Sequence, residues 1–418
     1  MNTTNINNTP KANRLHIALY GNRNSGKSSL LNFLTDQDFA LVSPIAGTTT
    51  DTVYKNMELS QVGPCVFLDT AGFDDEGTLG LLRVEQTKKT LNKVDIALML
   101  INSESLAALF PLNDPERSLN NALQTELQWM KTFSENKIPL ILLVSKADLL
   151  TDAQKKELIQ PLTRCFGIEP IYTSVYGEDT VDSVRKALLR AIPEDFEKNS
   201  ITGELAKAGD LVLLVMPQDI QAPKGRLILP QVQTIRDLLD KECIVTSCTT
   251  DTFENALFAL SKAPDLIITD SQVVRTVLEK KPTSSKLTTF SILFADYKGD
   301  LPYYILGAKA IEKLTKESRV LIAEACTHAP LTEDIGRVKI PRLLRKKAGE
   351  ELTIDFVRGA DFPEDLSQYD LIIHCGACMF NRRYVLSRTS RAKAQAVPMT
   401  NYGVAIAHLT GALSNLDI

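Results

Sequence analysis

The segment at residues 21–28 constrains the fold of this chain more than any other part of its sequence. It reads GNRNSGKS and therefore fits the pattern G-x-x-x-x-G-K-[ST]. It is preceded by the apolar run LHIALY and followed by the helical pattern SSLLNFL. A glycine-rich loop between a strand and a helix predicts a phosphate-binding loop, whose backbone N–H groups and helix N-terminus face an anion.

The rest of the chain alternates short apolar runs with longer amphipathic stretches, a rhythm typical of βα units on a mostly parallel sheet. Polar stretches at residues 194–204 and 279–286 divide it into three regions. The sequence therefore predicts an α/β chain in which a doubly wound P-loop sheet is followed by two smaller α/β domains. We expect a disordered tail at residues 1–13 and domains at 14–195, 203–281 and 283–418. In the last region, strand-like runs are FSILFA, RVLIAEA, LTIDFV and DLIIH.

Composition excludes several classes of protein. The chain has 418 residues, with 47 Lys and Arg against 51 Asp and Glu, so no global basic field favours nucleic acid as the main partner. Apolar runs such as DIALMLI are far shorter than the roughly 18 residues that span a bilayer. We expect a cytoplasmic protein without a membrane segment. Seven scattered cysteines favour reduced or metal-bound thiols over a disulfide framework.

Further motifs belong to the GTPase subset of P-loop proteins and follow in the usual order. They are GTTTD at residues 47–51, DTAG at 69–72, SKAD at 145–148 and TSV at 173–175. Lys27 would neutralise the β- and γ-phosphates, and Ser28 would ligate Mg²⁺. Asp69 would hold this ion through water, and Asp148 would accept the guanine N–H groups. Ser145 stands where the family pattern N-K-x-D has asparagine, which puts tight guanine binding in question.

The expected site of GTP or GDP combines residues from all these motifs. Its expected catalytic residues are Lys27, Asn24 and Thr49. Its expected nucleotide-binding residues are Gly21, Asn24, Ser25, Gly26, Lys27, Ser28, Ser29, Thr48, Thr49, Asp69, Gly72, Ser145, Lys146, Asp148 and Ser174.

The machinery for hydrolysis departs from the commonest pattern, because Phe73 occupies the place where many GTPases carry a water-orienting glutamine. Asn24 in the phosphate loop and the G-T-T sequence at residues 47–49 resemble the subgroup in which K⁺ replaces an arginine finger. This resemblance implies slow GTP hydrolysis that K⁺ stimulates.

Cysteine and histidine concentrate in two C-terminal segments, CTH at residues 326–328 and HCGAC at 374–378. Each segment follows a strand-like run, so in a parallel sheet both would meet at the carboxyl edge. Cys326, Cys375 and Cys378 predict a metal centre, and three thiolates with one further ligand suit either structural zinc or a [4Fe–4S] cluster. Basic runs at residues 337–347 and 382–393 flank the cluster; they are either solvated helix faces or an electropositive pocket.

The combination resembles the HydF family of [FeFe]-hydrogenase maturation GTPases over residues 14–418. The resemblance implies a GTPase domain, a middle dimerisation domain and a domain that holds a [4Fe–4S] cluster through Cys326, Cys375 and Cys378. It implies a scaffold or carrier that receives a di-iron precursor from two radical-SAM maturases and delivers it to the [FeFe]-hydrogenase apoprotein. The candidates for the fourth ligand are His328, His374 and Glu324.

The alternative from another class is a GTPase that acts on RNA or the ribosome and uses zinc as a structural element. The acidic net charge and the absence of aromatic residues interleaved with the basic runs argue against it. The family resemblance and the small size of the middle unit predict a homodimer. We expect it to bind neither membranes nor nucleic acid.

Overall fold

The computed structural model describes residues 13–35, 53–59, 61–70, 72, 87, 90–112, 114–177, 179–193, 196, 200–217, 227–325, 335–359 and 361–418. The chain forms two compact units, Met1–Glu197 and Lys198–Ile418. The predicted disordered tail lies outside the described residues, except for Asn13. None of the described helices combines the length and apolar character that a membrane crossing requires.

The first unit is built on a six-stranded sheet with the order β2-β3-β1-β4-β5-β6. All neighbouring strands are parallel except β2 and β3, which form an antiparallel pair. The strands are β1 (Leu15–Tyr20), β2 (Val53–Leu59), β3 (Gly63–Asp69), β4 (Ile96–Asn102), β5 (Leu140–Ser145) and β6 (Ile171–Tyr172). The predicted doubly wound P-loop sheet is confirmed.

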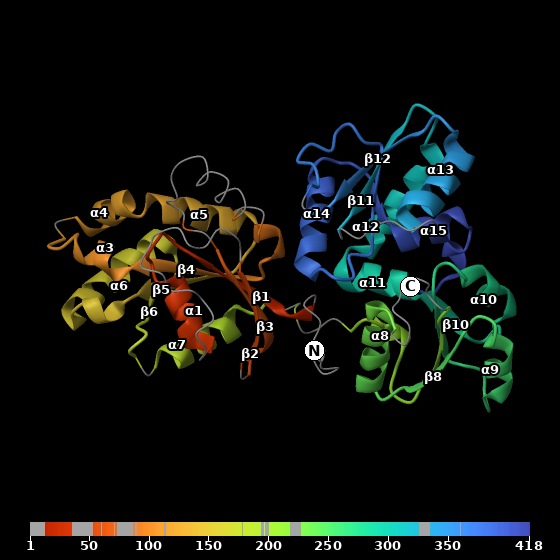
Figure 1. Ribbon diagram of the computed structural model, residues 1–418, viewed down its shortest axis with the longest axis horizontal. Coiled ribbons are helices and arrows are strands. Elements are labelled where there is room, and N and C mark those ends of the chain that lie inside the picture. Colours follow the sequence, from red (N-terminus) through yellow and green to blue (C-terminus); the bar gives the residue numbers. More distant parts are fainter. Residues whose placement is uncertain are drawn as a thin grey trace, which may run out of the picture. The chain divides into compact units, whose positions relative to one another are not determined.

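Helices cover both faces of this sheet (Figure 1). They are α1 (Lys27–Thr35), α3 (Ser103–Ala107), α4 (Pro115–Ala122), α5 (Gln124–Glu135), α6 (Asp152–Phe166) and α7 (Thr180–Ala191). The alternation along β1 divides the core, because Ile17 and Leu19 pack with α1 and α7 while Ala18 and Tyr20 pack with α5 and α6. Burial of both faces explains why β1, β4 and β5 are nearly continuous apolar runs.

The second unit begins with a four-stranded parallel sheet of order β10-β9-β7-β8. Its strands are β7 (Leu211–Val215), β8 (Ile244–Cys248), β9 (Leu266–Thr269) and β10 (Lys286–Thr289), and its helices are α8 (Leu229–Asp240), α9 (Phe253–Ala259) and α10 (Val274–Lys280). The sheet extends beyond residue 281, because β10 pairs with β9.

The other sheet of this unit has the parallel order β12-β11-β13-β14. Its strands are β11 (Arg319–Glu324), β12 (Thr353–Arg358), β13 (Leu371–His374) and β14 (Met399–Asn401). The helices that follow β10 are α11 (Phe290–Lys298), α12 (Leu301–Ala308), α13 (Ile340–Ala348), α14 (Arg382–Ala394) and α15 (Tyr402–Leu409). The two predicted α/β sheets are thus confirmed, whereas the division at residues 281–283 stays a prediction.

One predicted strand is wrong. The run FSILFA at residues 290–295 forms most of α11, which starts after Thr289, whose hydroxyl caps the helix by accepting the Ile292 N–H. Phe290, Leu293 and Phe294 pack with the first sheet of the unit, while Ile292 joins a core that includes Leu321 of the other sheet. Because α11 is buried on opposite sides, its residues lack the helical alternation of apolar and polar positions.

Candidate nucleotide and metal sites

The loop between β1 and α1 has the backbone conformations that its glycines were expected to supply. Gly21 has φ +148° and Gly26 φ +85°. A Cβ on Gly21 would lie 2.5 Å from the Leu100 carbonyl oxygen, so no larger residue fits there. Asn24, at the top of the loop, has φ +59° and an exposed side chain. The loop is therefore shaped by positions where a side chain is excluded or tolerates the left-handed region.

Lys27, the first residue of α1, is buried and points back to its own loop. Its ammonium donates to the carbonyl oxygens of Gly21 and Asn22, both at 2.8 Å. These oxygens hold the positive charge at the centre of the loop, where the sequence expects phosphate oxygens.

Ser28 and Asp69, the two expected Mg²⁺ residues, are brought together from α1 and the end of β3. The Ser28 hydroxyl donates to Asp69 Oδ2 at 2.7 Å. Asp69 Oδ1 is buried and has no hydrogen-bond partner among the described residues. Burial raises the pKa of Asp69, and the Ser28 hydrogen bond and the Lys27 charge oppose this shift. A hydroxyl beside a buried carboxylate with an unsatisfied oxygen fits a hard cation such as Mg²⁺.

Ser145 connects the base-reading loop to the phosphate loop. Its buried hydroxyl lies 2.6 Å from the Ser25 carbonyl oxygen and 3.1 Å from that of Ile101. The Ser145 carbonyl in turn accepts a hydrogen bond from the Ser103 hydroxyl at 2.6 Å. The residue that departs from the family pattern therefore still braces the phosphate loop.

The residues expected to read guanine lie next to one another. Lys146 has φ +52°, and its ammonium lies 3.1 Å from Glu104 Oε1. The Ser174 hydroxyl donates to Asp148 Oδ1 at 2.6 Å, so the last base-contacting loop orients the carboxylate. Of the other expected residues, Gly72 is buried and Ser29 half-buried, while Thr48, Thr49 and Phe73 lie outside the described residues.

The C-x-x-C turn follows β13 at the carboxyl edge of its sheet. β11 is its direct neighbour, with Ala323 opposite His374. The Ala325 N–H donates to Cys375 Sγ at 3.1 Å, and Ala325 immediately precedes Cys326. Burial raises the pKa of the Cys375 thiol, and the N–H groups of Ala325 and Ala377 oppose the shift. Two half-buried thiols in a C-x-x-C turn, one of which already accepts N–H donors, fit an iron–sulfur cluster.

Cys326 and His328 lie outside the described residues. Within the described part, no group of three His, Cys, Asp or Glu side chains is placed to hold a metal ion. The third expected thiolate ligand therefore remains a prediction.

His374 is fully engaged by its neighbours. Its Nε2 lies 3.0 Å from Nη1 of Arg388, which can only donate, and its Nδ1 lies 2.6 Å from the Cys375 carbonyl oxygen. This assigns the proton to Nδ1. Burial and the Arg388 charge lower the pKa of His374 to about 3, so the ring is neutral. With both nitrogens used, His374 orients the turn and has no atom left to ligate iron in this arrangement.

Glu324 ends β11 and is also occupied. Its Oε2 lies 2.9 Å from Arg337 Nη2 and 3.2 Å from Arg358 Nε, and the side chain is buried. Arg337 also stacks 4.9 Å above the ring of Phe356. A carboxylate held by two guanidinium groups is an anchored group, and using it as a ligand would require these ion pairs to rearrange.

Two arginines of the basic run on α14, Arg388 and Arg391, are held by contacts within the fold. Arg388 is 5% exposed and stacks on Phe362 and Tyr384. Arg391 donates to the carbonyl oxygens of Phe362 and Pro363 at 3.3 and 3.1 Å. Of these cations, Arg388 contacts His374, the residue that leads into the C-x-x-C turn. A high charge count in the sequence gives no sign of such burial.

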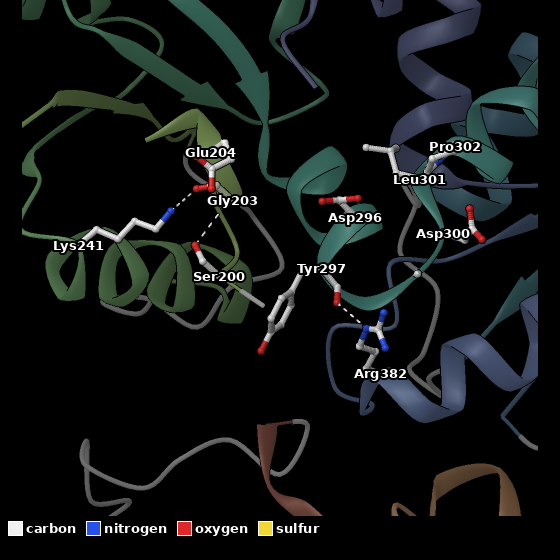
Figure 2. Close-up of a pocket in the computed structure, with 11 residues that line it drawn as sticks. Ser200, Gly203, Glu204, Lys241, Asp296, Tyr297, Asp300, Leu301, Pro302 and Arg382 are labelled. Carbon is white, nitrogen blue, oxygen red and sulfur yellow. Dashed lines mark hydrogen bonds between the residues drawn. The ribbon is translucent and has the colours of Figure 1, made fainter. Parts of the chain in front are cut away.

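A cavity of about 520 Å³ in the second unit is lined by the segment before β7, the end of α8, the segment joining α11 to α12, and the start of α14 (Figure 2). Lys241 reaches the Gly203 carbonyl on one side, and Arg382 Nε donates to the Tyr297 carbonyl at 3.2 Å on the other. Asp300 pairs with Lys393. None of the predicted site residues lines this cavity, which is polar and lined by charges that are partly compensated within the chain.

Three family models match the chain. They are described as a 50S ribosome-binding GTPase (residues 16–146), a hydrogen maturase F dimerization domain (201–299) and a hydrogen maturase F tetramerization domain (302–416). The two hydrogen maturase F models together match 99 + 115 = 214 of 418 residues. These domain types indicate self-association, and the N-terminal match identifies a P-loop GTPase, a class that binds GTP or GDP with Mg²⁺.

Individual relatives match the GTPase part. The tRNA modification GTPase MnmE of Lactobacillus acidophilus is 33% identical over 179 residues, 42% of this chain and 34% of the relative. The protein of the same name from Bacteroides fragilis is 31% identical over 183 residues, 43% of this chain and 36% of the relative. The chain thus spans about a third of these relatives. Aquifex aeolicus Era bound to GDP·AlF4⁻ matches 56% of this chain and 92% of its own at 19% identity, with a TM-score of 0.36.

Proposed function

The chain belongs to the HydF, or hydrogen maturase F, family, and from this premise we propose that it is a GTP-hydrolysing scaffold and carrier for hydrogenase maturation. In this role it holds a [4Fe–4S] cluster and delivers the di-iron precursor of the active-site cluster to the [FeFe]-hydrogenase apoprotein. It receives that precursor from two radical-SAM maturases. It works as a homodimer or a larger assembly of its own copies.

The nucleotide site supports the GTPase part of this proposal. Lys27 moves from the carbonyl oxygens of its own loop to the β- and γ-phosphates, while Asp148, oriented by Ser174, accepts the guanine N–H groups. Ser28 would ligate Mg²⁺, and Asp69, which lies beside it, would hold the ion through water. When bound, this ion neutralises charge on the transferred phosphate.

Hydrolysis in this proposal is slow and stimulated by K⁺. The support is Asn24, whose exposed side chain projects from the top of the phosphate loop where a second cation would approach the phosphates. The test measures GTP hydrolysis in KCl and in NaCl at equal ionic strength. Equal rates would reject the potassium assignment while leaving GTP hydrolysis itself intact.

One observation carries the cluster assignment: Cys375 accepts the N–H of Ala325, the residue directly before Cys326. The described chain therefore reaches the edge where the C-x-x-C turn lies at Ala325, one position before Cys326, and this supports Cys326 as the third ligand. When bound through three thiolates, a [4Fe–4S] cluster supplies a redox-active centre with one iron open to exchange. His374 and Glu324 are already bonded to arginine side chains. We therefore infer that the iron not bound by a cysteine carries a replaceable ligand. His328 remains a candidate for it.

The decisive experiment is iron and sulfide analysis of the full chain purified without oxygen. The proposal predicts iron and acid-labile sulfide in nearly equal amounts and an electron paramagnetic resonance signal after reduction. Zinc without sulfide would reject the carrier function and favour a GTPase with a structural metal. The tRNA modification named for the MnmE relatives is not carried over, because those matches cover only the GTPase part.

A further inference from the structure

Lys298, the last residue of α11, is a buried lysine beneath the C-x-x-C turn. Its side chain is 1% exposed. The ammonium donates to the carbonyl oxygens of Phe380 at 2.9 Å and Cys378 at 3.0 Å, and it lies 3.5 Å from that of Ala377. Burying an ammonium group is costly unless its hydrogen bonds are satisfied. The carbonyl oxygens of the turn therefore fix the position of the Lys298 ammonium, and the ammonium in turn holds these carbonyl oxygens in place.

The turn has features that need such a support. Ala377 adopts φ +45°, a left-handed conformation that L-residues other than glycine rarely take. Carbonyl oxygens from three nearby residues converge on one point, and their negative ends repel one another without a cation between them. Lys298 supplies this cation from a helix that belongs to the interior of the unit.

We propose that Lys298 is a positioning residue that holds the Cys375–Cys378 turn in its cluster-binding shape before any iron arrives. This inference rests on the cluster site of the proposed function and adds a residue to it. Lys298 acts through the backbone carbonyls, so its effect reaches both thiols together. Its ammonium also lies close to the turn that carries the two thiols, because it is bonded to the Cys378 carbonyl oxygen.

The positive charge of Lys298 shifts the reduction potential of the cluster in a definite direction. Three thiolates around a [4Fe–4S] core leave a negative overall charge, which becomes more negative on reduction. A buried cation next to the turn stabilises the reduced form more than the oxidised form. Lys298 therefore raises the reduction potential of the cluster relative to a variant without the charge.

The test compares Lys298→Met, which removes charge and donors, with Lys298→Arg, which keeps both. Lys241→Met is a matched control, since the Lys241 ammonium also binds backbone carbonyls, those of Gly203 and Ala206, away from the turn (Figure 2). Removing a partner of a metal ligand typically costs about 10- to 100-fold in metal affinity. We expect a loss of this size in iron retention for Lys298→Met, partial recovery for Lys298→Arg and no change for Lys241→Met.

A second readout needs no iron. Phenylarsine oxide captures two neighbouring thiols by forming two As–S bonds and releasing one water. We expect the apoprotein to be captured at Cys375 and Cys378, and the capture to be several-fold slower in Lys298→Met. Cys375→Ser identifies the signal from this pair. If wild-type protein captures the arsenical but binds no iron, the cluster assignment fails while the positioning role stands.

Two results would overturn the inference. One is a folded Lys298→Met protein with wild-type iron content, reduction potential and arsenical capture. If Lys298→Met does not fold, Lys298→Gln keeps amide donors but removes the charge, and we expect a lower reduction potential and an altered resonance spectrum in the reduced cluster. The second result that would overturn the inference is a folded Lys298→Gln protein whose cluster has an unchanged reduction potential and an unchanged resonance spectrum. GTP hydrolysis is measured throughout as a check on the first unit.

Discussion

Replacing Ser145 by alanine tests whether the base-reading loop controls the shape of the phosphate loop. The Ser145 hydroxyl holds the carbonyl oxygen of Ser25 at 2.6 Å. That carbonyl belongs to the planar peptide group that also contains the Gly26 N–H, so the two point in opposite directions. Fixing the oxygen therefore aims the Gly26 N–H at the expected phosphate position.

The size of the effect follows from burial. Ser145 is 5% exposed, and leaving a buried acceptor without its donor costs about 1–3 kcal/mol. If this free energy destabilises the conformation of the phosphate loop that binds nucleotide, the dissociation constants of the nucleotides rise by about 5- to 150-fold. We expect Ser145→Ala to weaken GDP and GTP alike within this range, because both contact the phosphate loop. Titration with a fluorescent guanine nucleotide measures these dissociation constants.

The control is Thr269→Val, which removes a buried hydroxyl 3.2 Å from the Val215 carbonyl in the second unit. It should lower the free energy of unfolding without changing nucleotide affinity. Unchanged dissociation constants in folded Ser145→Ala protein would refute the proposed link between the two loops. Loss of GTP binding alone, with GDP binding preserved, would place the effect at the γ-phosphate instead and equally contradict the argument.

Three further outcomes are expected. Lys27→Ala should abolish detectable nucleotide binding in the same titration, since it removes the charge at the centre of the loop. Cys375→Ser should lose most of the iron in an anaerobic metal analysis. Cys243→Ser should retain it, because the Cys243 thiol lies just before β8 and donates to the Lys207 carbonyl; equal losses would contradict the ligand assignment. Burial raises the pKa of Tyr304 to about 12 from 10.0. Neutral Tyr304 therefore contributes stability that is complete below pH 10 and lost as pH rises through about 12, and Tyr304→Phe should flatten this alkaline decline in urea unfolding.

The nucleotide site was largely predictable because its motifs are local. GNRNSGKS defines a loop whose glycine positions have the expected positive φ values, and the motif order predicts which strand ends meet. The role of Ser145 was not predictable. Its sequence position shows only that an asparagine is missing, whereas the hydrogen bond to Ser25 joins residues 120 positions apart.

The metal site shows a sharper limit of sequence reasoning. The segment HCGAC indicates thiol ligands, but nothing in the pattern distinguishes His374 as a neutral ring bonded on both sides from a free ligand. Lys298 and Arg388 resemble ordinary surface cations in the sequence, yet both are buried under the turn. The run FSILFA was misassigned because a short apolar segment fits a buried helix as well as a strand.

The sheet that carries Cys375 has a core of its own, in which Val320, Ile322, Leu371 and Ile373 pack against α13 and α15. In small zinc domains the metal replaces such a core, and the chain unfolds when the metal leaves. The apolar interior of this sheet is formed by side chains alone, so we expect it to stay folded when the metal is removed. In the proposed carrier role the protein would release its cargo in each cycle, and a core that does not depend on the metal would keep apolar surface buried at that stage.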